Sequence, residues 1–265
     1  MKKINILTFL LLIYSTAFAQ DPTSGIIIGT KIGVSQMITE ITPDFKEHLT
    51  EFDHKPGLAI DLEISKLLPN HWEIGTDIYL SNLRGENDNP DFTAEGFHNR
   101  MEDPIDDPVE YDNRLMGQKF FVGYYFRSFE NTSALFIPEP FLRAGIGYIQ
   151  YGVEVKYQDP ELGSIFGKGR GDFTNLSTSS MLFFLSAGVK SYLSPNFFIN
   201  TTVSCNYTNY DFLDGVYNYY SDGTRADLRG IYTELKVGLY FQTNGKGKSH
   251  RHIKGSSADP FPFSR

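Results

Sequence analysis

Strict alternation of apolar and polar residues from Gly57 to Ser81 constrains the fold more than any other feature of this sequence. A tight break, Leu68-Pro69-Asn70-His71, divides this stretch into two runs. Because successive side chains of a strand point to opposite faces, the two runs predict a hairpin with one apolar and one acidic face. The acidic face carries Asp61, Glu63, Glu73 and Asp77. A soluble β-protein would bury the apolar face, whereas a membrane barrel would enclose the acidic one.

The chain opens with the pattern of a secretory signal peptide. Met1-Lys2-Lys3 precedes an apolar run from Ile4 to Phe18, and Ala17-Phe18-Ala19 matches a signal-peptidase cleavage motif. An N-terminal membrane anchor is the alternative, but the run is shorter than the ~20 residues of a spanning helix. We therefore expect a signal peptide at residues 1–19, one barrel domain at residues 20–241 and a tail at residues 242–265.

Composition excludes several classes of protein. The net charge is −8, and loss of Lys2 and Lys3 makes it −10, which argues against a nucleic-acid partner. The single cysteine, Cys205, excludes an internal disulfide framework. No apolar run after the signal peptide approaches the length of a transmembrane helix. A membrane protein built from this mature chain must therefore be a closed barrel.

Eight segments alternate with period two, and each can supply the roughly 9–11 residues of a tilted transmembrane strand. They are residues 26–37, 57–67, 72–81, 115–127, 140–155, 180–193, 197–207 and 228–241. Shorter and longer connections alternate between them, as expected for a barrel with both termini on the side of the short turns. The fifth segment becomes irregular near Gly147, which indicates a bulge. The pattern predicts an all-β, eight-stranded antiparallel up-and-down transmembrane barrel.

Charges on the predicted polar faces are nearly balanced, although the whole protein is acidic. An enclosed lumen requires this balance, because desolvation costs several kcal/mol per unpaired ion. Counting along the strands places five charged residues at mid-height on the first, second, third and eighth segments, which are neighbours in a closed barrel. We predict that these five form one ionic cluster: Lys31, Glu63, Asp77, Glu234 and Lys236. Scattered surface charges on a soluble sandwich are the alternative.

Three further segments indicate a family. The last predicted strand, Glu234 to Phe241, ends in an aromatic residue, and Gly29 to Gly33 and Ala144 to Tyr148 are rich in glycine. Together with the signal peptide and the eight strands, they resemble small bacterial outer-membrane barrels of the OmpA/OmpX type and the porin-family or PorT-like outer membrane β-barrel proteins of Bacteroidota. The resemblance implies a monomer in outer-membrane lipid with periplasmic termini. Phe241 is not the chain terminus, which departs from the simplest members.

No confident metal or catalytic site is predicted. The acidic connection 82–114 offers oxygen ligands for Ca²⁺ at Asp103, Asp106, Asp107 and Glu110. Their spacing matches no EF-hand, so a solvated loop is the preferred interpretation. No histidine lies on a strand beside an outward-facing serine, so we expect neither nucleophilic catalysis nor a cofactor.

The predicted function is non-enzymatic. Eight strands leave room for side chains or one small ligand, so the lumen is expected to be plugged. A structural or surface-recognition role remains, with a protein or glycan as the partner of the long loops. The loop aromatics Phe45, Phe52, Phe92, Phe97, Tyr217, Tyr219 and Tyr220 would either anchor that partner or pack within the loops. A PorT-like secretion- or transport-accessory barrel and a soluble lipocalin-like binder are the alternative functions.

The basic, Gly/Ser-rich tail predicts a disordered periplasmic extension.

Overall fold

A computed structural model describes most of the predicted barrel domain. The described residues are 25–41, 47–48, 52–68, 71–88, 107–126, 138–166, 178–194, 196–209, 213–215 and 229–243. The predicted signal peptide and all but the first two residues of the predicted tail lie outside them. No helix among the described residues is long and apolar enough to cross a bilayer.

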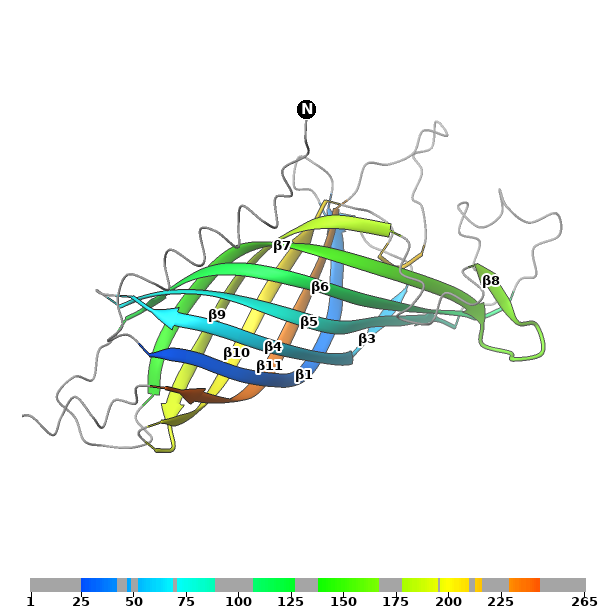
Figure 1. Cartoon of the computed structure of the whole chain (residues 1–265). Helices are drawn as coiled ribbons and strands as arrows, with labels where there is room; N and C mark the ends of the chain where they lie inside the picture. The colour runs from blue at the N-terminus through cyan, green and yellow to red at the C-terminus, as the bar shows by residue number, and fades with distance from the viewer. Residues whose placement is uncertain are drawn as a thin grey trace, which may run out of the picture.

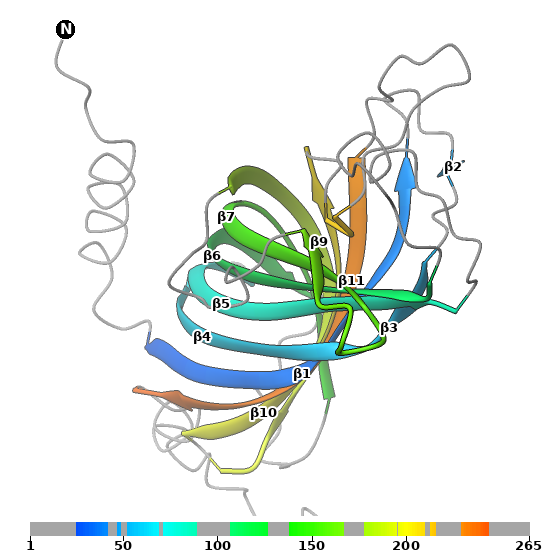
Figure 2. The same cartoon turned by 90° about the vertical axis from the view of Figure 1, so that its right-hand side faces the viewer.

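Eight long antiparallel strands close a barrel (Figures 1 and 2). They are β1 (Ile26–Ile41), β4 (Gly57–Leu67), β5 (Trp72–Asn87), β6 (Val109–Tyr125), β7 (Pro138–Tyr157), β9 (Thr178–Tyr192), β10 (Phe197–Thr208) and β11 (Arg229–Gln242). Each pairs with its neighbours along the chain, and β1 pairs with β11 to complete the circle. Three short strands, β2 (Glu47–His48), β3 (Asp53–Lys55) and β8 (Ser164–Phe166), add to β1, β5 and β7. The predicted eight-stranded up-and-down barrel is confirmed.

Side chains of the barrel are arranged inside out relative to a soluble protein. Ile60, Leu62 and Ile78 are 37%, 58% and 50% exposed, whereas Glu63 and Asp77 are 1% and 4% exposed. The other six long strands also turn large apolar side chains outward, among them Ile32, Val122, Ile146, Leu185, Val203 and Val237. These residues form an apolar belt around the barrel, and the charged residues of the same strands face its axis.

The strands run further toward the long connections than the alternation predicted. β5 continues to Asn87 and β6 begins at Val109, so the acidic connection is shorter than residues 82–114. Beyond the belt the polarity of the two faces is reversed, because Leu83, Tyr111 and Val153 are buried while Arg84, Glu110 and Glu154 lie on the outer wall. A sheet with an apolar inner face and a polar outer face is the arrangement of water-exposed β-structure.

The bulge predicted near Gly147 is absent. Pairing of β7 with both β6 and β9 is regular through Gly147. The irregularity in the sequence arises instead from the reversal of polarity along β7. Charged or small residues point inward in the first part of the strand, whereas Ile149, Tyr151 and Val153 point inward in the part that follows.

The ends of β5, β6 and β7 reach beyond the neighbouring strands (Figure 1). With β3 and β8 they form a projecting sheet, and its inner face packs against a segment from the β10–β11 connection. Asn113 donates a hydrogen bond of 2.7 Å to the carbonyl of Leu213. Gly215 adopts a φ of 84° and lies so close to Val155 that no side chain would fit. The long-loop end is therefore filled by an apolar core.

The short-turn end has an apolar layer of its own. Tyr192, Phe198 and Tyr240 pack with Ile27 inside the barrel. Phe198 and Tyr240 stack with ring centroids 4.9 Å apart. Both rings point inward, as their places in the alternation require. Aromatic residues near the strand ends of a membrane barrel commonly point outward and form a girdle at the membrane interface. Buried charged residues lie beside this cluster, and Lys190 Nζ is 4.1 Å from the centre of the Phe198 ring.

Candidate functional site

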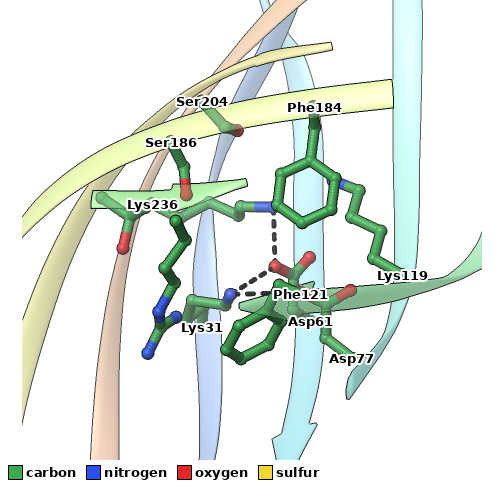
Figure 3. A pocket seen from close by; sticks show the side chains of 11 residues that line it. Lys31, Asp61, Asp77, Lys119, Phe121, Phe184, Ser186, Ser204 and Lys236 are labelled. Carbon is green, nitrogen blue, oxygen red and sulfur yellow. Dashed lines mark ion pairs between the residues drawn. The ribbon is translucent and has the colours of Figure 1, made fainter. Parts of the chain in front are cut away.

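The structure brings the five predicted cluster residues together inside the barrel. Lys31 Nζ lies 2.9 Å from Glu63 and 3.5 Å from Asp77, and Lys236 Nζ lies 2.8 Å from Glu234. Asp61 joins the two groups, because its carboxylate is 3.0 Å from Lys31 and 2.6 Å from Lys236 (Figure 3). All of these side chains are at most 5% exposed.

The network extends further than the predicted cluster. Lys119 Nζ lies 2.8 Å from Glu234, and Arg143 joins Glu63 and Glu73 at 3.0 and 2.9 Å. The alternation had placed Asp61 and Glu73 on the acidic face but had not assigned them to the cluster. Register supplies the missing information, since Lys31 pairs with Asp61 and Asp77 with Lys119 across neighbouring strands.

Arg143 has the most extensive contacts in this network. Its Nε and one terminal nitrogen bind the two carboxylate oxygens of Glu73 at 3.0 and 3.1 Å, and its other terminal nitrogen binds Glu63 at 3.0 Å. Phe121 and Phe141 lie on the guanidinium with ring centroids 4.5 and 4.6 Å from Cζ. A planar guanidinium satisfies both demands, whereas a lysine ammonium would satisfy neither fully.

Aromatic rings surround the cations of β6, β7 and β9. Lys119 Nζ lies 4.1 Å from the centre of the Tyr79 ring, and Lys190 Nζ lies 4.1 Å from that of Phe198. Ring faces attract cations and also exclude water from them. Phe121 and Tyr125, which interrupt the polar pattern of β6, point inward for this reason, and Tyr125 also donates a hydrogen bond to Glu73. The alternation alone gave no indication of this role.

Little space remains between these side chains. One cavity adjoins Lys31, Asp61, Asp77, Lys119 and Lys236, with hydroxyl groups of β9 and β10 on its far side (Figure 3). The centre of a water molecule has about 10 Å³ available there. Such a site suits one small polar molecule and is far too small for a nutrient or a signalling ligand.

The predicted Ca²⁺ ligands are only partly described. Asp103 and Asp106 lie outside the described residues, Asp107 just precedes β6, and Glu110 lies on β6 with its carboxylate 2.7 Å from Lys156. In the described ranges no group of three or more His, Cys, Asp or Glu side chains is arranged to hold a metal ion.

Of the predicted loop aromatics only Phe52 is described. It is buried and packs edge-on against Tyr111, with ring centroids 5.0 Å apart. Phe52 therefore packs within the protein, which was the alternative to anchoring a partner.

No protein-family model matches the sequence, and no curated protein matches it. Solved structures with a similar fold include Neisserial surface protein A (13% identity, TM-score 0.41, 82% of this chain and 96% of that chain) and OprG from Pseudomonas aeruginosa (9%, 0.41, 83% and 96%). The outer membrane protease OmpT from Escherichia coli is also similar (9%, 0.37, 83% and 97%). The likeness is to the general fold of outer-membrane barrels at low identity. The PorT-like resemblance stays a prediction.

Proposed function

We propose that this chain is an integral protein of the bacterial outer membrane, with both termini in the periplasm and the long connections outside the cell. The apolar belt is the observation that carries the proposal. At about 25 cal/mol per Å² of apolar surface, a belt encircling all eight long strands would be very costly to leave in water. A lipocalin-like soluble binder requires the opposite orientation of Leu62 and Glu63.

Localisation is tested by fractionation of cells that express the full chain. We expect the mature protein in the outer-membrane fraction, and we expect its gel mobility to change on heating, as for a folded barrel. Recovery in the aqueous fraction without detergent would contradict the proposal.

We infer that the lumen of this barrel does not carry solutes. Buried ion pairs occupy its middle, and opening a path for a solute would break them. We infer that the protein acts as a structural or recognition element of the cell envelope.

Recognition would use the projecting sheet and the loops it carries. Its outer wall is polar and ordered by ion pairs, such as Lys55 with Glu86 at 2.6 Å and Lys156 with Glu110 at 2.7 Å. The hydrogen bond from Lys156 to Glu110 raises the pKa of the lysine. A rigid polar platform on an anchored barrel suits a protein or glycan partner.

The recognition role is tested with a variant in which a short turn joins Asn82 directly to Arg114. We expect this variant to keep its heat-modifiable mobility and to lose binding to arrays of glycans and extracellular-matrix proteins that the intact protein binds. Equal binding by the two proteins would contradict a role for this hairpin.

A further inference from the structure

Four buried carboxylates of the lumenal network have an oxygen that accepts no hydrogen bond from the described residues: those of Glu63, Glu234, Asp61 and Asp77. Asp61 and Asp77 are 1% and 4% exposed, yet Oδ1 of each accepts no hydrogen bond from the described residues. Lys31 and Lys236 approach Oδ2 of Asp61, and Lys31 approaches Oδ2 of Asp77. In these two aspartates the acceptors that no lysine approaches are therefore the Oδ1 atoms. Buried polar groups in proteins normally have a partner, which is either another protein group or an ordered water.

Both residues line the one cavity described inside the barrel (Figure 3). Ser186 of β9 and Thr202 and Ser204 of β10 line its other side. About 10 Å³ is available to a water centre, and one water requires roughly 10–15 Å³ on that measure. Apolar clusters lie toward the long-loop end and toward the short-turn end of the barrel, on either side of this space.

We propose that this cavity binds one ordered water molecule. The water donates hydrogen bonds to Oδ1 of Asp61 and Asp77 and accepts one from the hydroxyl of Ser186. A metal cation is disfavoured because the ammonium groups of Lys31 and Lys236 already occupy the same carboxylates. An anion is disfavoured because the vacant positions are acceptors.

The bound water gives the barrel a connection that its side chains do not make directly. It joins the charged side chains of β1, β4, β5 and β11 to the hydroxyl-bearing wall of β9 and β10. The water then hydrates one site within the ion-paired network. This inference depends on the interior alone and stands independently of the proposed recognition role.

A crystal structure of the full chain in detergent, at a resolution that shows ordered water, tests the proposal. We expect one density peak within hydrogen-bond distance of both Oδ1 atoms. An empty cavity, or carboxylates turned so that lysines satisfy all four oxygens, would overturn it. An anomalous peak at this site after soaking in rubidium or bromide salts would show an ion and would equally overturn it.

A pair of nearly isosteric variants on β9 provides the control. Ser186 lines the cavity and Ser179 is exposed, so Ser186→Ala should abolish the peak and Ser179→Ala should retain it. In solution, nuclear magnetic resonance cross-relaxation between a long-lived water and the amides of residues 61 and 77 should show the same difference. Absence of this signal in the unaltered protein would contradict the proposal even if Ser186→Ala fails to fold.

Discussion

Arg143 illustrates how much one residue contributes to the interior. Three of its nitrogens bind Glu63 and Glu73, and two aromatic rings cover its faces. Arg143→Met leaves both carboxylates buried without that partner. We expect the free energy of unfolding to fall by about 3–5 kcal/mol, the usual cost of breaking a buried pair. Arg143→Lys keeps the charge but loses the fork and should recover only part of this loss.

Urea unfolding in lipid vesicles measures this loss. The single tryptophan, Trp72, is 46% exposed on the outer wall and reports on the barrel without labelling. Arg114→Met is the matched control, because Arg114 is partly exposed and lies 3.8 Å from Asp112, so its loss should cost less than about 1 kcal/mol. Equal effects of the two substitutions would contradict the importance of the buried network.

For single residues, the sequence predicted which side chains point into the barrel but not which acid pairs with which base. Strand parity correctly placed the charged residues inside. Which acid meets which base depends on register, and counting along strands did not give it: Asp61, rather than Glu63, lies directly opposite Lys31. The inward aromatics were missed because a large apolar residue on a polar face looks like an interruption of the pattern.

Strand length was the main error at the scale of elements. In β6, the side chains of Val109, Tyr111 and Leu115 point to the same inner face as that of Lys119. The alternation therefore continues along the strand, but the apolar residues change from the outer face to the inner one. A search for one constant apolar face ends each strand at this reversal. This reversal of the apolar face was the signal in the sequence that the strands continue. It marks the point where the outer wall of the barrel leaves the apolar medium.

This interpretation predicts which residues are accessible from outside the cell. In a Cys205→Ala background, Glu154→Cys lies on the outer wall of the projecting sheet, whereas Ser194→Cys lies in a short turn. A membrane-impermeant thiol reagent added to intact cells should label the first variant only. Labelling of Ser194→Cys before the outer membrane is permeabilised would contradict the proposed orientation.

The corner between β3 and β5 should respond to acid. Burial lowers the pKa of His54 from 6.5 to about 4, although Asp53 opposes the change. The folded corner therefore holds a neutral imidazole, 2.9 Å from the Tyr111 hydroxyl, while the unfolded chain takes up a proton near pH 6.5. The stability that His54 contributes is complete above pH 6.5 and declines as the pH falls toward 4.

Amide hydrogen exchange at residues 53–55 and 84–86, corrected for intrinsic rates, measures this response. We expect weaker protection at pH 5 than at pH 7 in the unaltered protein and a much smaller difference in His54→Gln. The same difference in both proteins would assign the acid sensitivity to another group.

At the scale of the whole molecule the interior determines whether solutes pass. Eight strands enclose a space that side chains can fill, and here two apolar clusters and an ionic network lie in it. We expect no discrete conductance steps when the purified barrel is inserted into planar bilayers. Steps of constant size that depend on folded protein would contradict a closed lumen.

The fold class followed from the sequence because one alternation recurs eight times with alternating short and long connections. The three short strands and the packing of Leu213 in the mouth did not follow, since they depend on contacts between distant segments.

The central claim is that the outer wall of this barrel contacts lipid. Spin labels at Leu62 and Ile78, in protein reconstituted into vesicles, test it most directly through collisions with oxygen and with a water-soluble nickel chelate. The account predicts high access to oxygen and low access to nickel at both positions, and the opposite at Glu154. High access to nickel at Leu62 and Ile78, or burial from both reagents, would contradict it.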